Sequence, residues 1–170
     1  MDRKSETNTD NTHFRTGLFA KCASREDIKA ELNKIRFDNC YFIPCESEPP
    51  CPYVNDTAEI FLHGSCHIFA EQLRKICSNY DIYKIEDKNG NAVHWYAQAL
   101  YKGTTLYIDV RGATNSFEEL VSEFHSQIVG GYKIQKQTEE VISADEHWVE
   151  TGILFATAII NDNLDYYFIR

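Results

Sequence analysis

Apolar residues recur along this chain with two periods, that of a helix and that of a strand. The helical period is found first over residues 25–36. Its apolar positions are Ile28, Leu32 and Ile35. Ser24 and Asp27 have the spacing of a capping box, in which each side chain accepts a hydrogen bond from the other residue's backbone amide. The pattern therefore predicts a helix that begins directly after Ser24.

A second helical pattern covers residues 65–77. Its apolar face is formed by Phe69, Leu73 and Ile76. Two further capping-box spacings are Ser116 to Glu119 and Ser143 to Glu146. They predict a short helix over 117–124 and a longer helix that ends near residue 160.

The strand period dominates the middle of the chain. Residues 81–87 predict one short strand, and residues 92–112 predict a β-hairpin whose two halves are rich in Tyr, Val and Thr. The pair Lys102-Gly103 is suited to the hairpin turn. Residues 164–170 are also rich in strand formers and predict a last strand. Helices thus flank a β-rich middle, which is the order of an α+β fold.

The turn decides which residues of the hairpin lie opposite one another. With the turn at residues 102–103, His94 lies opposite Arg111. Tyr96 then lies opposite Asp109, and because side chains alternate along a strand, all four share one face. His94 and Asp109 become diagonal neighbours, roughly 7–8 Å apart at their α-carbons. The other face is apolar, which opposes a one-residue slip, and it carries Leu106, Ile108 and Val110.

The composition is that of an ordinary globular chain. Of its 170 residues, 43% are hydrophobic and 25% are charged, which suffices for one buried core. We expect a single domain over residues 14–170 that follows a disordered polar tail over 1–13. A net charge of −9 argues against nucleic acid as the main partner. No apolar run reaches the roughly 18 residues that a membrane span requires, so no membrane partner is expected.

The first residues lack the apolar stretch of a secretory signal. We therefore expect a cytoplasmic protein whose six cysteines are reduced rather than joined in disulfides. A reduced cysteine is a core residue, a metal ligand or a nucleophile, and its position in the fold distinguishes the three.

Cys66 is the cysteine whose position suggests chemistry. It follows a Gly-Ser pair and lies at the start of the predicted helix over 65–77, and a helix N-terminus near an imidazolium favours the thiolate form of a cysteine. His94 is then a candidate general base, and Asp109 is a candidate partner that fixes the orientation of the imidazole. The first backbone amides of the helix are suited to bind an oxyanion.

Two stretches of the sequence resemble a known family. The stretch GSCHIFA resembles the element around the nucleophile of transglutaminase-like proteins, a branch of the papain-like cysteine hydrolases. The stretch HWYAQALYKGTTLYIDVRG resembles their second element, in which a His opens one strand and an Asp lies near the end of the next. Arylamine N-acetyltransferases share this core. The match covers residues 64–112.

This resemblance implies an α+β, papain-like core in which the nucleophile helix packs on an antiparallel sheet. It implies a Cys66, His94 and Asp109 triad that acts on a peptide or protein amide through a thioester, as a protease, deamidase or acyl transferase. It requires neither a cofactor nor a metal. The chain departs from the family pattern at residues 110–112, where Val-Arg-Gly replaces the frequent Pro or Ala-Gly. It also shows no Gln or Trp upstream of Cys66 that would supply a second oxyanion donor.

Other residues are candidates for binding the substrate or its oxyanion: His63, Ser65, Tyr96 and Arg111. His63 and Ser65 precede the nucleophile, whereas Tyr96 and Arg111 share the predicted face of His94. For Tyr96 and Arg111, ordinary sheet packing and a surface ion pair are equally good interpretations.

Two readings without catalysis stay open. Cys66 alone is compatible with a buried structural thiol, in a catalytically inactive papain-like scaffold that serves as a protein-binding module. The other reading is a metal site that borrows His63 or Cys66. Three further cysteines lie in the proline-rich loop over 40–57, at spacings too wide for the usual zinc motif. They are Cys40, Cys45 and Cys51.

Overall fold

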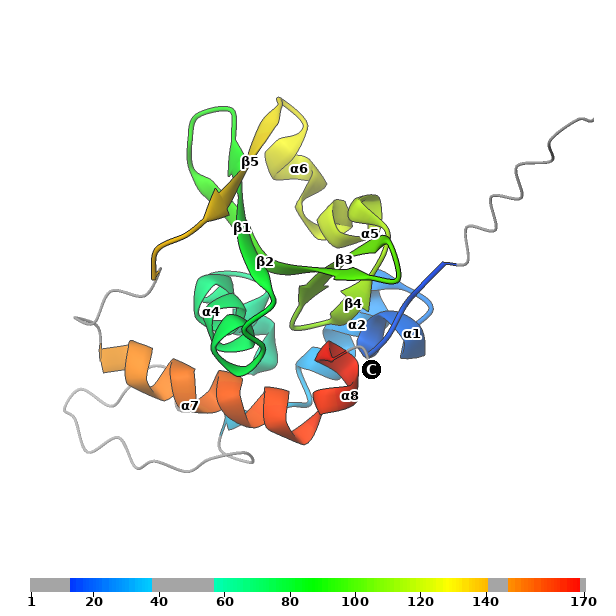
Figure 1. Cartoon of the computed structure of the whole chain (residues 1–170), viewed down its shortest axis with the longest axis vertical. Coiled ribbons are helices and arrows are strands. Elements are labelled where there is room, and N and C mark those ends of the chain that lie inside the picture. Colours follow the sequence, from blue (N-terminus) through cyan, green and yellow to red (C-terminus); the bar gives the residue numbers. More distant parts are fainter. Residues whose placement is uncertain (1–12, 38–56, 141–146, 169–170) are drawn as a thin grey trace, which may run out of the picture.

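The computed structural model describes residues 13–37, 57–140 and 147–168. Three of the sequence predictions lie outside these ranges: the polar tail, the proline-rich loop and the capping box at Ser143. Of their residues, only His13 and Thr57 are described. The described residues form five strands and a set of mostly short helices (Figure 1).

The strands form one antiparallel sheet with the order β4-β3-β2-β1-β5. Their bounds are β1 Asp81–Asp87, β2 Ala92–Tyr101, β3 Thr104–Asp109, β4 Gly112–Thr114 and β5 Tyr132–Gln137. Helices precede, interrupt and follow the strands along the chain, so the α+β class predicted from the sequence is confirmed.

The register of the central hairpin agrees with the prediction. Tyr101 pairs with Thr104, and Ala97 pairs with Ile108 at the far end of the β2–β3 ladder. Lys102 and Gly103 form the turn with φ values of 49° and 80°, as a two-residue hairpin turn with positive φ at both positions requires. Beyond this ladder, β2 continues along β1.

Helices cover both faces of the sheet (Figure 1). On one face lie α4 Cys66–Ile76 and α7 His147–Asp162, which pack against each other and, through α4, against β2. On the other face lie α5 Phe117–Val121 and α6 His125–Ile128, which contact β3, β4 and β1. The remaining helices are α1 Leu18–Lys21, α2 Arg25–Leu32, η1 Ala58–Phe61, η2 Ser122–Phe124 and α8 Leu164–Tyr167.

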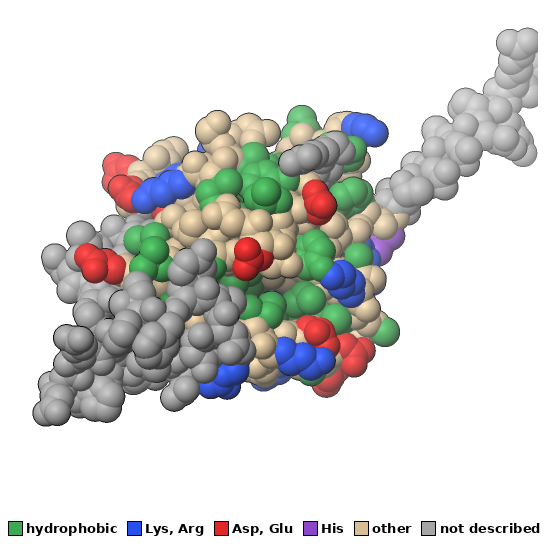
Figure 2. Space-filling view, turned by 90° about the horizontal axis from the view of Figure 1, so that it is seen from below, with side chains coloured by type: hydrophobic (Ala, Val, Ile, Leu, Met, Phe, Trp, Pro, Cys, Tyr) green, Lys and Arg blue, Asp and Glu red, His purple; other side chains and the backbone are tan. Residues whose placement is uncertain are grey.

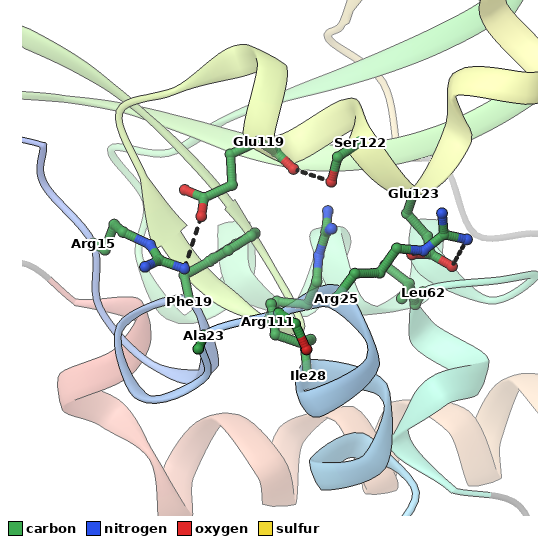
Figure 3. Close-up of a pocket in the computed structure, with 11 residues that line it drawn as sticks. Arg15, Phe19, Ala23, Arg25, Ile28, Leu62, Arg111, Glu119, Ser122 and Glu123 are labelled. Carbon is green, nitrogen blue, oxygen red and sulfur yellow. Dashed lines mark hydrogen bonds and ion pairs between the residues drawn. The ribbon is translucent and has the colours of Figure 1, made fainter.

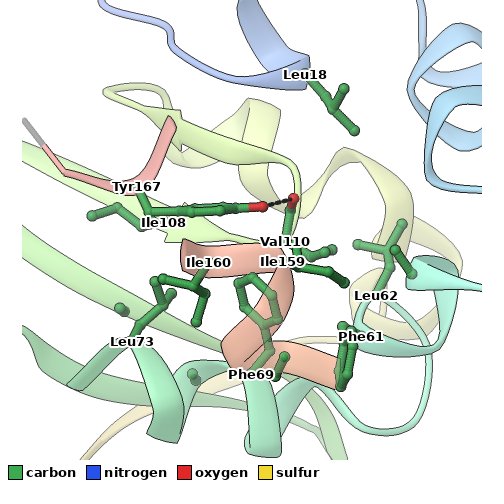
Figure 4. Packing of buried hydrophobic residues seen from close by; sticks show 14 of the residues in the cluster. Leu18, Phe61, Leu62, Phe69, Leu73, Ile108, Val110, Ile159, Ile160 and Tyr167 are labelled. Atoms are coloured by element: carbon green, nitrogen blue, oxygen red, sulfur yellow. Dashed lines mark hydrogen bonds between the residues drawn. The ribbon is translucent and has the colours of Figure 1, made fainter. Parts of the chain in front are cut away.

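Each face has its own apolar cluster. The larger one joins α4, α7 and α8 to the sheet, and its ring contacts include Phe61 with Phe69 and Phe155 (Figure 4). The smaller one packs α5 and α6 on the opposite face. Its buried members are Ile85, Tyr96, Leu120, Val121 and Ile128. The sheet is therefore the middle layer of the molecule.

Charged side chains are spread among other types on the surface. On the face seen in Figure 2, lysine and arginine side chains lie beside acidic and apolar ones. Among the described helices, none has both the length and the apolar character needed to cross a membrane.

Three of the differences from the sequence predictions concern the end of the chain, β5 and α2. The predicted last strand is wrong: its first four residues form α8, whose Tyr167 hydroxyl donates a hydrogen bond to the Val110 carbonyl at 2.9 Å (Figure 4). β5 was not predicted, because its residues are largely polar and exposed and only Tyr132 and Ile134 alternate with polar residues. The first predicted helix, α2, has its capping box at Ser24 and Asp27 but ends at Leu32, four residues early.

Candidate active site

Cys66 is the first residue of α4, the helix that packs on the centre of the sheet. The chain reaches it through Gly64, whose φ of 121° is one that side-chain-bearing residues rarely adopt. The carbonyl of Ser65 accepts the amide of Ile68 and so begins the helical hydrogen bonds. Cys66 is 5% exposed, and it lies between the exposed Gly64 and the half-buried His67.

His94 and Asp109 form a buried pair on neighbouring strands. Nε2 of His94, on β2, lies 3.0 Å from Oδ2 of Asp109 at the end of β3. The two side chains are 0% and 2% exposed. The direct contact shows that both side chains point to the same side of the hairpin, as the alternation of the two strands predicts.

The thiol of Cys66 lies beside the same imidazole. Burial lowers the pKa of His94, but the hydrogen bond with Asp109 and the interactions with the Cys66 side chain outweigh it, so the pKa is raised overall. Since Nε2 is bonded to Asp109, Nδ1 is the ring nitrogen left for the thiol. Nδ1 is buried and makes no well-directed hydrogen bond to any described residue. The structure thus brings Cys66, His94 and Asp109 together.

Asp109 is held from its other side by Arg111. The Arg111 backbone amide donates to Oδ1 at 2.8 Å, Nε lies 3.1 Å from both carboxylate oxygens, and Nη2 lies 2.5 Å from Oδ2. Burial raises the pKa of Asp109, but the Arg111 charge and the hydrogen bonds from His94 and Arg111 lower it well below its usual range. Asp109 is therefore a carboxylate at any ordinary pH.

The segment after β4 covers one face of the His94 ring. Phe124 of η2 stacks on the His94 ring with 4.4 Å between centroids, and its edge meets the His63 ring at 5.7 Å. His63 also contacts Oε1 of the buried Glu123 at 3.2 Å. This side of the imidazole is therefore shielded by carbon, and His63 is tied to the same segment.

The four residues proposed for substrate or oxyanion binding have different surroundings. His63 is 36% exposed and lies at the surface next to the nucleophile segment. Ser65 is buried at the N-terminus of α4. Tyr96 is 1% exposed and packs in the smaller apolar cluster, and Arg111 is 3% exposed and bonded to Asp109. A substrate-binding role for Tyr96 and Arg111 stays a prediction, since Tyr96 packs among apolar side chains and Arg111 contacts Asp109.

Two contacts of the site were not foreseen. Phe124 and Glu123 lie in the predicted short helix, where nothing in the sequence distinguishes them from other residues of that helix. Their position follows from how the segment after β4 folds back over the sheet, as the contacts of α5 and α6 show. Of the histidines near Cys66, His67 approaches Trp95, with 6.4 Å between ring centroids.

A small pocket of about 90 Å³ is lined by Arg111 (Figure 3). The Arg111 guanidinium points into it from the sheet, and Arg15 and Arg25 reach it from the N-terminal segments. Each of these two arginines has a carboxylate partner, Glu119 for Arg15 and Glu123 for Arg25. The charges around the pocket are therefore balanced in pairs.

Free cysteines in the described part of the chain are Cys22, Cys66 and Cys77. Within that part, no group of three or more His, Cys, Asp or Glu side chains is arranged to hold a metal ion. The three cysteines of the proline-rich loop lie outside the described residues.

Comparison of the chain with protein-family models, with curated proteins and with solved structures finds no match.

Proposed function

We propose that this chain is a cysteine-dependent amide hydrolase or acyl transferase with a papain-like arrangement of its active site. Cys66 is the nucleophile, His94 is the general base and acid, and Asp109 orients His94. The substrate is an amide of a peptide or a protein, and the reaction passes through a thioester on Cys66.

One observation carries this proposal. A fully buried imidazole has one nitrogen bonded to a carboxylate at 3.0 Å, while the thiol that lies beside it begins a helix. A histidine with only a packing role does not require a carboxylate at one ring nitrogen and a thiol near the other. The packing of α4 on an antiparallel sheet, with the histidine and the acid on adjacent strands, agrees with a papain-like core.

In the first half of the reaction, Nδ1 of His94 takes the proton of the Cys66 thiol. The sulfur attacks the carbonyl carbon of the substrate and forms a tetrahedral intermediate. When the C–N bond breaks, His94 gives its proton to the departing amine, and an acyl group stays on Cys66 as a thioester. Asp109 accepts a hydrogen bond from Nε2 throughout and stabilises the imidazolium.

In the second half, His94 removes a proton from water or from an acceptor amine. The oxygen or nitrogen attacks the thioester carbonyl, the C–S bond breaks, and the proton returns to the sulfur through His94. Water as the acceptor gives an acid, which is hydrolysis or deamidation. An amine as the acceptor gives a new amide, which is acyl transfer.

The negative oxygen of the intermediate requires hydrogen-bond donors. The amide of Cys66 is the first of α4, where backbone amides have no acceptor within the helix. His63 and Ser65 are the neighbouring candidates for a second donor. The substrate approaches from the side of Gly64 and His67, because Cys66 is nearly covered and these flanking residues reach the surface.

The two other described thiols are poorly suited to this chemistry. Burial raises the pKa of Cys22, and Glu31 and Asp27 raise it further. Burial likewise raises the pKa of Cys77. Both thiols are therefore protonated near neutral pH, and they serve as internal references for the reactivity of Cys66.

The test is alkylation of the native protein by iodoacetamide, with each cysteine followed by peptide mass spectrometry. We expect Cys66 to be modified about tenfold faster, or more, than Cys22 and Cys77 at pH 7. His94→Gln should slow the labelling of Cys66, because the thiol loses its base. His125→Gln replaces an exposed histidine of α6 and is the matched control, with labelling at the rate of the unaltered chain.

Labelling in urea is the reference, because all six thiols should react once the protein is unfolded. An electrophilic peptide amide that adds its acyl mass to Cys66, and not to the Cys66→Ser variant, then identifies the acyl-enzyme. If Cys66 labels no faster than Cys22 and Cys77, or if His94→Gln leaves its rate unchanged, the enzyme proposal is wrong.

A further inference from the structure

Arg111 is buried, although most arginines lie at the protein surface. Its side chain is 3% exposed, and its guanidinium lies over the ring of Phe19 at 4.7 Å and near that of Phe124 at 5.9 Å. In the plane of the guanidinium, Nη2 bonds both Oδ2 of Asp109 and the Leu120 carbonyl, at 2.5 Å and 2.6 Å. Aromatic rings therefore fix its plane, and two acceptors fix its direction.

Asp109 is the charged partner of this guanidinium. A buried cation is costly unless it is paired and hydrogen-bonded, and Asp109 satisfies both conditions for Arg111. The same carboxylate oxygen that meets Nη2 of Arg111 also meets Nε2 of His94 at 3.0 Å. Arg111 and His94 thus approach one acid from two sides.

We propose that Arg111 is a positioning residue that keeps Asp109 ionised and facing His94 while the imidazole is neutral. This inference rests on the proposed function, because it assigns a role in the same triad. With Arg111 present, the negative charge of Asp109 is balanced in both protonation states of His94. Without Arg111, the imidazolium of His94 would be the group that neutralises the buried carboxylate. The pKa of His94 would then be too high for it to act as a base.

Other ionisable groups face the pair from the elements packed around it. The thiol of Cys66 lies on the His94 side, from α4. From α8, Tyr167 is close enough to Asp109 that burial and the carboxylate charge together raise its pKa, so it stays neutral. Across the pocket from Asp109, the charged residues are themselves paired: Arg15 with Glu119 and Arg25 with Glu123. Arg111 is therefore the cation that contacts Asp109 directly among the described residues.

The test follows the titration of His94 by nitrogen-15 NMR of the histidine rings, with its signal assigned by its loss in His94→Gln. Arg111→Gln removes the charge and keeps a hydrogen-bond donor for Leu120. We expect the titration midpoint of His94 to move upward by about one pH unit or more in this variant. Arg111→Lys keeps the charge, and its midpoint should stay closer to that of the unaltered chain than to that of Arg111→Gln.

Chemical rescue makes the same test without relying on one variant. Arg111→Ala enlarges the pocket of Figure 3, and added guanidinium, below denaturing concentration, can occupy the space of the lost side chain. We expect guanidinium to return the His94 midpoint toward its original value, and urea, which has the same shape without the charge, to leave it displaced. Arg15→Ala is the matched control, since Arg15 lines the pocket but is paired with Glu119.

An unchanged midpoint in Arg111→Gln overturns the inference, as does equal rescue by urea and guanidinium. The titration needs no turnover, so this result is independent of the alkylation test. An unreactive Cys66 overturns the proposed function, whereas an unmoved His94 midpoint overturns only the role of Arg111.

Discussion

The ring of Phe124 lies nearly parallel to the imidazole of His94, with 4.4 Å between centroids and 26° between planes. Phe124 is 1% exposed and belongs to a segment that connects β4 to β5 and covers one face of the sheet. One face of the imidazole is therefore closed to water, and the bonded pair of His94 and Asp109 is itself buried. A hydrogen bond in such dry surroundings is stronger than one that water can reach.

We expect Phe124→Leu to weaken the reactivity of Cys66 while the fold persists. Leucine fills part of the same space, so the loss of unfolding free energy should stay below the about 3–5 kcal/mol typical of replacing Phe with Ala. Water that reaches His94 will weaken its bond to Asp109, and alkylation of Cys66 should slow several-fold. Urea unfolding gives the stability, and iodoacetamide labelling gives the reactivity.

Phe155→Leu is the control for this variant, because Phe155 is equally buried in the same larger cluster but packs against Phe37 and Phe61. It should cost similar stability and leave the labelling rate of Cys66 as it was. If both variants slow the labelling equally, the effect of Phe124 is one of general packing and not of shielding.

Gly64→Ala tests how the backbone positions the nucleophile. A Cβ at this position would have room, since its nearest neighbour is the Ile60 carbonyl oxygen at 3.9 Å, but the φ of 121° is strained for alanine. We expect a loss of about 1–3 kcal/mol in unfolding free energy and a displaced Cys66 that labels more slowly. Gly131→Ala has a similar φ of 108° and open space, so it should cost similar stability without altering the labelling. Equal labelling in the two variants would contradict a role for Gly64 in placing the thiol.

The sequence predicted the hairpin and its register because both depend on local signals. A two-residue turn sets the register, and the apolar face opposes a one-residue slip of that register. Together they are enough to place His94 near Asp109. The start of α4 is equally local, since Gly64 allows the turn and the helical period begins at once. The three candidate triad residues followed from these two elements and from the resemblance to transglutaminase-like proteins.

The surroundings of the triad depend on long-range packing, which a single sequence does not reveal. Arg111 was expected on the face of His94 as a surface or substrate-binding residue, but the fold buries it under Phe19 and Phe124, from two other segments of the chain. The end of the chain illustrates the same limit. Its strand formers belong to α8 instead, where Tyr167 is buried in the larger cluster.

Tyr167→Phe tests whether α8 supports the end of β3. The Tyr167 hydroxyl donates to the Val110 carbonyl at 2.9 Å, one residue beyond Asp109, in fully buried surroundings. Its loss leaves that carbonyl without this donor, so we expect a decrease of about 1–3 kcal/mol in unfolding free energy, measured by urea unfolding. Tyr101→Phe is the matched control, because it removes a hydroxyl at the half-buried end of the hairpin and should change stability by less. A larger loss in Tyr101→Phe would show that the bond to Val110 is unimportant.

The low pKa of Asp109 links the stability of the fold to pH. Its pKa is lowered in the folded chain, so the carboxylate stabilises the fold above its unfolded pKa of about 3.9, and this contribution is lost as pH falls through the folded value. Asp109→Asn leaves Arg111 without its charged partner, and we expect it to cost about 3–5 kcal/mol at pH 7. The stability difference between the unaltered chain and Asp109→Asn should then narrow below about pH 4, as urea unfolding at a series of pH values will measure. A difference that stays constant from pH 7 to the acid limit would mean that Asp109 is not held as a carboxylate by Arg111 and His94.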